Sequence, residues 1–104
     1  MKAHLIYVTT RDRAEARAIG RSLVASRLVA CVNIFTDMES IYYWEDELQE
    51  EYEAVLIAKT TENRVRDVIA AVREQHSYEC PCIVSFPIAQ GHTGYLDWIA
   101  GQVR

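Results

Sequence analysis

The sequence predicts an α+β domain in which helices pack against one face of an antiparallel sheet. Short strand-like segments alternate with helical segments, and a long hairpin occupies the centre of the chain. The predicted order is β-α-β-β-α-β followed by a C-terminal helix, which is the ferredoxin-like, split βαβ arrangement. At 104 residues the chain has the size of one domain, residues 1–104, with a single core.

The N-terminal part of the chain predicts a buried strand followed by a helix. Residues 5–8 form a continuous apolar run, which is typical of a strand covered on both faces. Asp12, with Glu15 three residues later, resembles a capping box, and apolar residues then recur at helical spacing. Because a glycine inside a helix costs stability, Gly20 indicates close packing.

A long hairpin is predicted in the middle of the chain. Over residues 28–35 the apolar period changes to two, and residues 36–39 interrupt this pattern. Residues 40–44 are again strand-like, polar residues around Asp46 are expected to turn the chain, and residues 52–59 form the returning strand.

A second helix, a last strand and a short helix complete the predicted order. Thr60 or Thr61 is expected to cap the second helix. Its apolar residues follow the i, i+3, i+4, i+7 pattern: Val65, Val68, Ile69 and Val72. Residues 82–88 form the last strand, with Pro87 at an edge or bulge, and Thr93 caps the final helix.

One face of the predicted sheet is too apolar to remain in water, because it carries Cys31, Phe35 and some of the aromatic residues 42–44. Hairpin arms of about fifteen residues reach about 50 Å, whereas a domain of this size has a radius of gyration of about 13 Å. The hairpin must therefore bend or project onto a neighbour. We expect a homo-oligomer.

Composition and motifs argue against several functional classes. The chain has 11 basic and 15 acidic residues, a net charge of −4, and no basic stripe with interleaved aromatic residues, so a nucleic-acid partner is not expected. Its apolar runs are too short for a signal sequence or a membrane span, and its three cysteines favour reduced thiols in a cytoplasmic protein. No phosphate-binding loop, pair of catalytic carboxylates or Ser/His/Asp order indicates an enzyme.

Residues 76–82 concentrate an imidazole, a phenol, a carboxylate and two thiols. In an extended segment Cys80 and Cys82 project to the same side, where their thiolates could join His76 and Glu79 in binding Cu(I) or Zn(II). The alternative is structural. A histidine on the buried side of a helix C-terminus can cap it, and free cysteines are often packed as small apolar residues. Both interpretations remain open.

Six further residues are candidates for a pocket. Lys59 follows a buried strand and is expected to pair with Glu79 or bind an anion. Cys31 has apolar neighbours, which favour packing over nucleophilic chemistry. Aromatic walls between subunits would come from Tyr42, Trp44, Tyr78 and Trp98, although an oligomer interface alone also explains these residues.

Five segments of the chain resemble, in order, the signature segments of the CutA divalent-cation tolerance proteins. These segments are residues 30–34, 40–45, 59–60, 76–81 and 95–99. The resemblance covers nearly the whole chain. It implies a ferredoxin-like subunit, a tightly packed homotrimer with strand pairing between subunits, and a role in tolerance to divalent cations, copper especially.

The chain departs from this family pattern at specific positions. Where the family usually shows His-Pro-Tyr-Glu-Val-Pro, Ser77 replaces the first proline and Cys80 the valine. Some members also have a cysteine at the end of the first strand and a second histidine before the motif histidine. Val8 and Gln75 hold those places here, so a copper site built from those groups would keep only His76.

The resemblance therefore implies a non-enzymatic, cytoplasmic homotrimer in divalent-metal homeostasis. Copper or another divalent cation is the expected ligand, and folding is expected to require no cofactor. Two alternatives stay open: a signalling trimer that binds a small molecule, such as an organic anion, in clefts between subunits, and a trimeric scaffold that anchors another protein.

Overall fold

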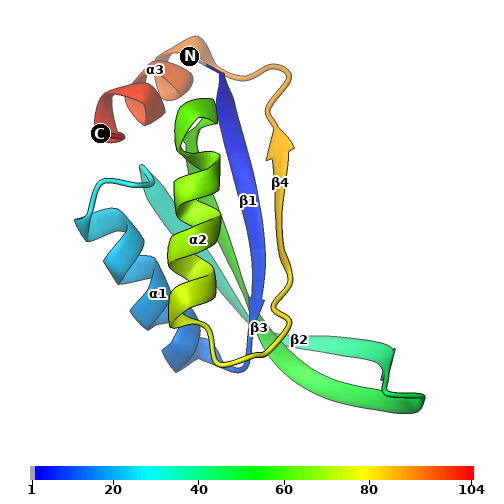
Figure 1. Cartoon of the computed structure of the whole chain (residues 1–104). Coiled ribbons are helices and arrows are strands. Elements are labelled where there is room, and N and C mark those ends of the chain that lie inside the picture. Colours follow the sequence, from blue (N-terminus) through cyan, green and yellow to red (C-terminus); the bar gives the residue numbers. More distant parts are fainter. Residues whose placement is uncertain (1) are drawn as a thin grey trace.

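The computed structural model describes residues 2–104 and confirms the predicted α+β, ferredoxin-like fold (Figure 1). The elements are β1 (Ala3–Thr10), α1 (Arg13–Ala25), β2 (Cys31–Trp44), β3 (Glu47–Thr61), the 3-10 helix η1 (Glu62–Arg64), α2 (Val65–Gln75), β4 (Ile83–Pro87) and α3 (Thr93–Gln102). The four strands form one antiparallel sheet in the order β2-β3-β1-β4.

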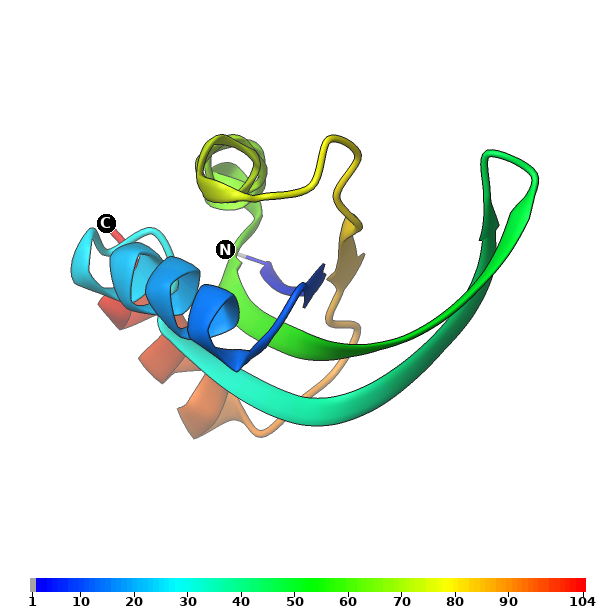
Figure 2. The ribbon, with the colours of Figure 1, turned by 90° about the horizontal axis from the view of Figure 1, so that it is seen from below.

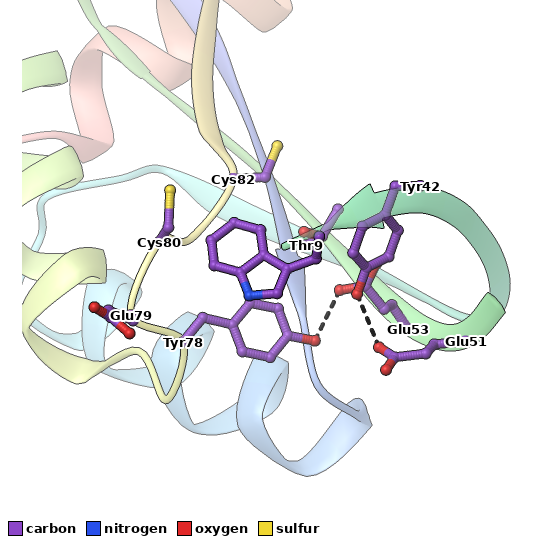
Figure 3. A pocket seen from close by; sticks show the side chains of 9 residues that line it. Thr9, Tyr42, Glu51, Glu53, Tyr78, Glu79, Cys80 and Cys82 are labelled. Atoms are coloured by element: carbon purple, nitrogen blue, oxygen red, sulfur yellow. Dashed lines mark hydrogen bonds between the residues drawn. The ribbon is translucent and has the colours of Figure 1, made fainter. Parts of the chain in front are cut away.

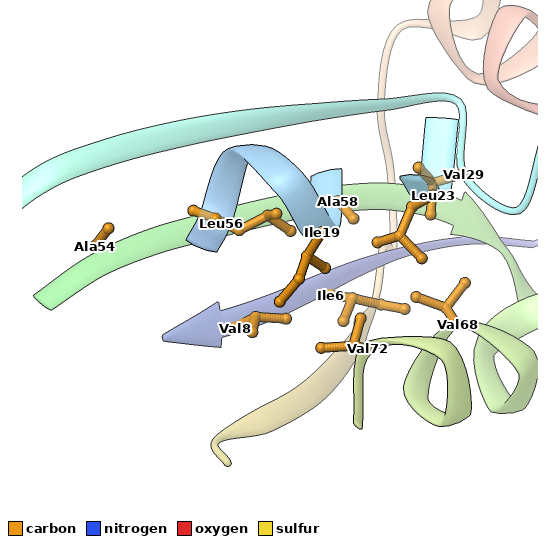
Figure 4. Close-up of a cluster of buried hydrophobic side chains, with 11 residues drawn as sticks. Ile6, Val8, Ile19, Leu23, Val29, Ala54, Leu56, Ala58, Val68 and Val72 are labelled. Atoms are coloured by element: carbon orange, nitrogen blue, oxygen red, sulfur yellow. The ribbon is translucent and has the colours of Figure 1, made fainter. Parts of the chain in front are cut away.

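The main core lies between the sheet and the pair of helices α1 and α2 (Figure 4). Alternate residues of β1 and β3 point toward these helices, whose apolar stripes close the other side. The fully buried residues of this core include Ile6, Val8, Ile19, Leu23, Leu56, Val68 and Val72. Each such side chain contributes about 1.5–3 kcal/mol to stability by leaving water. A smaller cluster formed by Ala3, Ala30 and Ile99 anchors α3.

Gly20 allows α1 to approach the sheet closely, as its place in the sequence predicts. A Cβ atom at this position would lie 2.9 Å from Cγ2 of Val32 and 3.3 Å from Cδ1 of Leu56. Val32 is held stiffly in β2 and Leu56 is fully buried, so neither side chain can yield easily. A larger residue at position 20 would push α1 away from the sheet.

The start of α1 is tied to the segment that follows α2. Asp12 is the N-cap, as predicted, and its carboxylate accepts a hydrogen bond from the amide of Glu15 at 2.9 Å. The Glu15 side chain does not return to the cap amide. It accepts instead from the amide of Arg11 at 2.9 Å and from the amide of Ser77 at 2.8 Å. One carboxylate therefore joins two segments that are distant in sequence.

The hairpin has the predicted length, with arms of 14 and 15 residues, but its details differ from the sequence pattern. Residues 36–39 do not end a strand: β2 passes through them with a bulge between Phe35 and Met38, and Asp37 takes a positive φ of 60°. The strand also starts at Cys31 rather than at residue 28. At the tip, Glu45 and Asp46 have φ values of 51° and 64°, as a type I′ turn requires.

Two predicted helix caps are wrong. Thr60 and Thr61 belong to β3, and the Thr60 hydroxyl donates to the carbonyl of Leu28 at 2.7 Å, which holds the loop before β2. Thr61 is the N-cap residue of η1, not of α2, and its side chain makes no capping hydrogen bond. A 3-10 turn then intervenes before α2 starts at Val65. At α3 the N-cap is His92, whose Nδ1 accepts from the amide of Tyr95 at 3.1 Å, and Thr93 is the first helical residue.

The sheet face opposite α1 and α2 is largely uncovered, as expected. The register places Cys31 opposite Lys59, and Leu5 opposite Phe86, on this face. Figure 2 shows α3 below one end of the sheet and the β2–β3 hairpin curving away beyond the other strands. Exposed apolar residues on this face and on the hairpin are Phe35, Ile41, Tyr43, Leu48, Tyr52, Val84 and Phe86.

Within residues 2–104, both edge strands also lack a partner on their outer side, namely β2 and β4. The chain reaches 45 Å along its longest axis, so the hairpin projects from the domain while bending, as its length predicts. None of the described helices combines the length and apolarity needed to cross a membrane.

Candidate functional site

The segment from His76 to Cys82 connects α2 to β4 and lies beside the end of β1. Helix α2 ends at Gln75, and His76 is its C-cap with extended backbone angles. This placement confirms that the motif histidine ends the helix on its buried side. The following residues cross the base of the sheet before β4 begins at Ile83.

The imidazole of His76 is fully buried, with a side-chain exposure of 0%. Its Nε2 lies 2.8 Å from the carbonyl oxygen of Thr9, to which it donates, and its Nδ1 accepts from the amide of Tyr78 at 3.1 Å. These two bonds assign the neutral tautomer with the proton on Nε2. Both ring nitrogens are therefore engaged in linking β1 to the segment that follows α2.

A cavity of about 440 Å³ opens between this segment and the base of the hairpin (Figure 3). It brings together six of the predicted residues with three others. The lining residues are Thr9, Tyr42, Trp44, Glu51, Glu53, Tyr78, Glu79, Cys80 and Cys82. The remaining predicted residues do not line it: His76, Cys31, Lys59 and Trp98.

Two phenol–carboxylate pairs organise the hairpin side of the cavity. Tyr78 donates its hydroxyl proton to Glu53 at 2.8 Å, and Tyr42 donates to Glu51 at 3.0 Å. Burial and the hydrogen bond to Glu53 raise the pKa of Tyr78 well above its ordinary value. The hydrogen bond to Glu51 raises the pKa of Tyr42. Both phenols therefore remain protonated donors at neutral pH.

The two thiols lie on the other side of the same cavity. Cys80 and Cys82 are exposed and unpaired. Figure 3 shows both sulfur atoms well away from the carboxylates of Glu51 and Glu53. The Glu79 carboxylate also points away from the carboxylates of Glu51 and Glu53. Across residues 2–104, the structure gathers no group of three or more His, Cys, Asp or Glu side chains in a metal-binding arrangement.

Cys31 and Lys59 form a separate cluster on the open face of the sheet, beside α3. The ammonium of Lys59 donates to Oδ1 of Asn33 at 2.6 Å and lies 3.9 Å from the Cys31 sulfur. The Tyr95 hydroxyl lies 3.5 Å from the same sulfur, and this contact raises the pKa of Tyr95 to about 12. The expected pairing of Lys59 with Glu79 is wrong, because Asn33 holds the ammonium instead.

Comparison with known proteins identifies the family. A family model described as CutA1 divalent ion tolerance protein matches residues 4–102. The chain belongs to the CutA family. The divalent-cation tolerance protein CutA of Thermus thermophilus is 40% identical over 95 residues, which are 91% of this chain and 92% of that protein. The chloroplastic protein CutA 1 of Oryza sativa is 33% identical over 100 residues, covering 96% of this chain.

Solved CutA structures share the fold. The crystal structure of CutA1 from Oryza sativa aligns with a TM-score of 0.96 at 32% identity, covering 100% of this chain and 95% of that one. The periplasmic divalent cation tolerance protein CutA from Archaeoglobus fulgidus aligns with a TM-score of 0.94 at 36% identity, covering 98% and 99%. The chain spans only about half the length of the plant relatives it matches, 56% and 55%. The family description refers to divalent ions and specifies no reaction.

The departures of this chain from the CutA motif have visible structural effects. Ser77 donates its backbone amide to Glu15, a bond that a proline at this position could not make. Cys80 adds a second thiol to the rim of the cavity beside Cys82. The resemblance is thus confirmed; at the two departing positions Ser77 bonds to Glu15 and Cys80 lines the cavity.

Sequence reasoning missed three lining residues, Thr9, Glu51 and Glu53. A signal was present, because residues two apart in a strand share a face, as Glu51 and Glu53 do. In the sequence both belong to an acidic run, residues 45–53, whose pattern favours a solvated hairpin end over a cation-binding cluster. The contact that recruits Glu53 spans 25 residues and depends on the curvature of the hairpin.

Proposed function

We propose that this protein acts without catalysis in tolerance to divalent metal ions, copper among them, as a homotrimer that binds metal through Cys80 and Cys82. The family description supports the metal role, since the relatives are named for divalent-cation tolerance. The observation that carries the site is the pair of exposed, unpaired thiols on one side of a single cavity.

The donor chemistry of this site suits a soft metal ion. Thiolates select Cu(I) and also bind Zn(II), whereas carboxylates alone favour harder ions. Glu79, adjacent to Cys80, offers an oxygen donor from the same segment. His76 joins the ligands only if its Nδ1 releases the amide of Tyr78, so we assign it the least direct part in binding. We expect folding to require no metal, an expectation supported by the extensive apolar core between the sheet and the helices.

Calorimetric titration with Cu(I), Cu(II) and Zn(II) under reducing, anaerobic conditions tests the site. We expect the double variant Cys80→Ser/Cys82→Ser to bind Cu(I) at least about tenfold more weakly, because a soft ion loses its thiolates. Cys31→Ser is the matched control and keeps the affinity, since Cys31 lies in the separate cluster. Equal Cu(I) binding by the double variant and the unchanged protein would remove the thiols from the site. A chelator is expected to leave the melting temperature unchanged.

The trimeric assembly is supported by the apolar side chains and the strand edges that a single chain leaves exposed. Phe86 on the edge strand β4 is 53% exposed, and further apolar side chains lie on the same sheet face and along the hairpin. Contiguous apolar surface and open strand edges are features that soluble proteins normally cover. A homotrimer, which the CutA resemblance implies, would cover them with copies of this chain.

Light scattering at micromolar concentration is expected to give three times the subunit mass of 11.9 kDa. Phe86→Asp places a charge in the proposed interface and should shift the protein toward monomers, because an unpaired buried charge is strongly unfavourable. Ala18→Asp adds the same charge on the exposed side of α1 and should leave the mass unchanged. A stable monomer of the unchanged protein would contradict the assembly.

The cytoplasm is the proposed location, supported by the three free cysteines, which persist in a reducing compartment. Relatives are named as chloroplastic in plants and as periplasmic in Archaeoglobus fulgidus, so location varies within the family. Cell fractionation of the host organism decides the matter, and recovery outside the cytoplasm would overturn the assignment.

A further inference from the structure

The hairpin side of the cavity has a composition different from that of the thiol side. Its walls are the aromatic side chains of Tyr42, Trp44 and Tyr78, and its polar groups are the carboxylates of Glu51 and Glu53. Lys, Arg and His are absent from the residues that line the cavity in the described chain. This half of the cavity is therefore aromatic and negatively charged.

The negative charge is not neutralised within the chain. Glu53 is only 8% exposed, yet none of the ion pairs within residues 2–104 includes it. Its Oε2 accepts from the Tyr78 hydroxyl, and no described residue donates to its Oε1. Burying a carboxylate without a cation is costly, and Glu51 adds a second negative charge from the same face of β3. The second carboxylate oxygen of Glu53 thus has no partner among residues 2–104 and is free to accept from a ligand in the cavity that Glu53 lines.

A cation is the ligand that this arrangement can stabilise. The faces of aromatic rings attract positive charge, and the free carboxylate oxygens can accept hydrogen bonds from N–H donors. Hard metal ions such as Ca²⁺ require six or more oxygen ligands, which this mainly aromatic lining does not offer. The volume of about 440 Å³ lies within the usual range of small-molecule sites.

We propose that this half of the cavity binds a small organic cation through an ammonium group held between the carboxylates of Glu51 and Glu53 and the rings of Tyr42, Trp44 and Tyr78. The alkyl part of the ligand packs against the aromatic walls. An organic anion is disfavoured, because no cationic side chain of residues 2–104 lines the cavity: Lys59 is held by Asn33 elsewhere, and Arg11 and Arg13 line a separate pocket on another side of Glu53. This proposal is independent of metal binding at the thiols.

Titration of the assembled protein with 1,4-diaminobutane, followed by calorimetry, tests the proposal. We expect saturable binding of the diamine and none of 1,4-butanediol, which has the same length without charge. Tetramethylammonium, which cannot donate a hydrogen bond, should bind more weakly than the diamine. Binding of the diol with equal affinity would overturn the proposal, because charge would then play no part.

Variants assign the binding to the cavity. Glu53→Gln keeps an acceptor for Tyr78 but removes the charge, and should weaken diamine binding about tenfold or more. Glu50→Gln, a matched control, makes the same charge change at an exposed neighbouring residue that does not line the cavity, and should have no effect. An equal loss in both variants would show unspecific attraction to an acidic hairpin and overturn the site.

Two further variants distinguish a loss of diamine binding from a loss of folding and from a loss of metal binding. Trp44→Leu removes an aromatic wall at a partly exposed position, so it should fold normally while weakening diamine binding. Cys80→Ser/Cys82→Ser should retain full diamine affinity even where Cu(I) binding is lost. Diamine binding that disappears with the thiols, or that survives unchanged in both Trp44→Leu and Glu53→Gln, would refute the proposed site.

Discussion

Glu15→Ala is expected to lower the free energy of unfolding by about 2–4 kcal/mol at neutral pH, because two partly buried hydrogen bonds from backbone amides lose their acceptor and each unsatisfied donor costs about 1–3 kcal/mol. Those amides belong to Arg11, before α1, and Ser77, in the segment that lines the cavity. The variant therefore loosens the connection between the first helix and the site. Urea denaturation followed by circular dichroism measures the change.

The same carboxylate makes stability depend on pH. Burial raises the pKa of Glu15, but hydrogen bonds from Ser77 and Arg11 outweigh this effect, and the folded-state pKa lies below the ordinary value of 4.5. A group with a depressed pKa stabilises the fold above its ordinary pKa, and this contribution is lost as the pH falls through the folded-state pKa. The unchanged protein should therefore have a higher free energy of unfolding than Glu15→Gln at neutral pH, and this difference should shrink below pH 4.5.

Glu74→Gln is a suitable control for this experiment, because Glu74 is exposed on α2. Its stability should follow that of the unchanged protein over the whole pH range. A stability difference between Glu15→Gln and the unchanged protein that stayed constant from neutral pH to pH 3 would show that the charge of Glu15 contributes nothing.

His76→Ala is the second variant with a large expected effect. It empties a fully buried position and leaves the Thr9 carbonyl and the Tyr78 amide without partners, which together should cost about 2–4 kcal/mol. His76→Gln should lose less, because its amide nitrogen can still donate toward the Thr9 carbonyl. Thermal and urea denaturation of the three proteins give the comparison.

The same variants separate a structural histidine from a metal ligand. If His76 acts mainly through its two hydrogen bonds, His76→Ala lowers stability while Cu(I) affinity, measured below the unfolding transition, stays within a few-fold of that of the unchanged protein. A variant that remained fully stable and lost Cu(I) binding as completely as Cys80→Ser/Cys82→Ser would place His76 among the ligands instead.

Periodicity in the sequence was sufficient to predict the order of the elements and the face that each one buries. The apolar spacing of α2 and the alternation in β3 correspond directly to the residues that pack in the core. Local signals failed where a longer-range contact competed with them. Thr60 has the chemistry of a helix cap, but its hydroxyl is bound by the carbonyl of Leu28, and the polar break at residues 36–39 is absorbed as a bulge.

The candidate site was predictable only in part, for a similar reason. Residues 76–82 stand out because their chemistry is concentrated in one segment. Glu53 meets Tyr78, and Glu51 lines the same cavity, only because of how the hairpin curves where it leaves the other strands. The local sequence does not predict that curvature, so the sequence pattern of Glu51 and Glu53 is that of ordinary surface charges.

The two open edges of the sheet are not equivalent, and this sets how copies of the chain can join. If β4 of one copy paired with β2 of the next, each addition would leave one edge of each kind free at the ends of the assembly. Such head-to-tail growth stops only when the rotation between neighbours closes a ring, and otherwise continues as a filament. In such an assembly the curvature of the hairpin, with its bulge between Phe35 and Met38, would contribute to that rotation and so help to determine whether a ring or a filament forms.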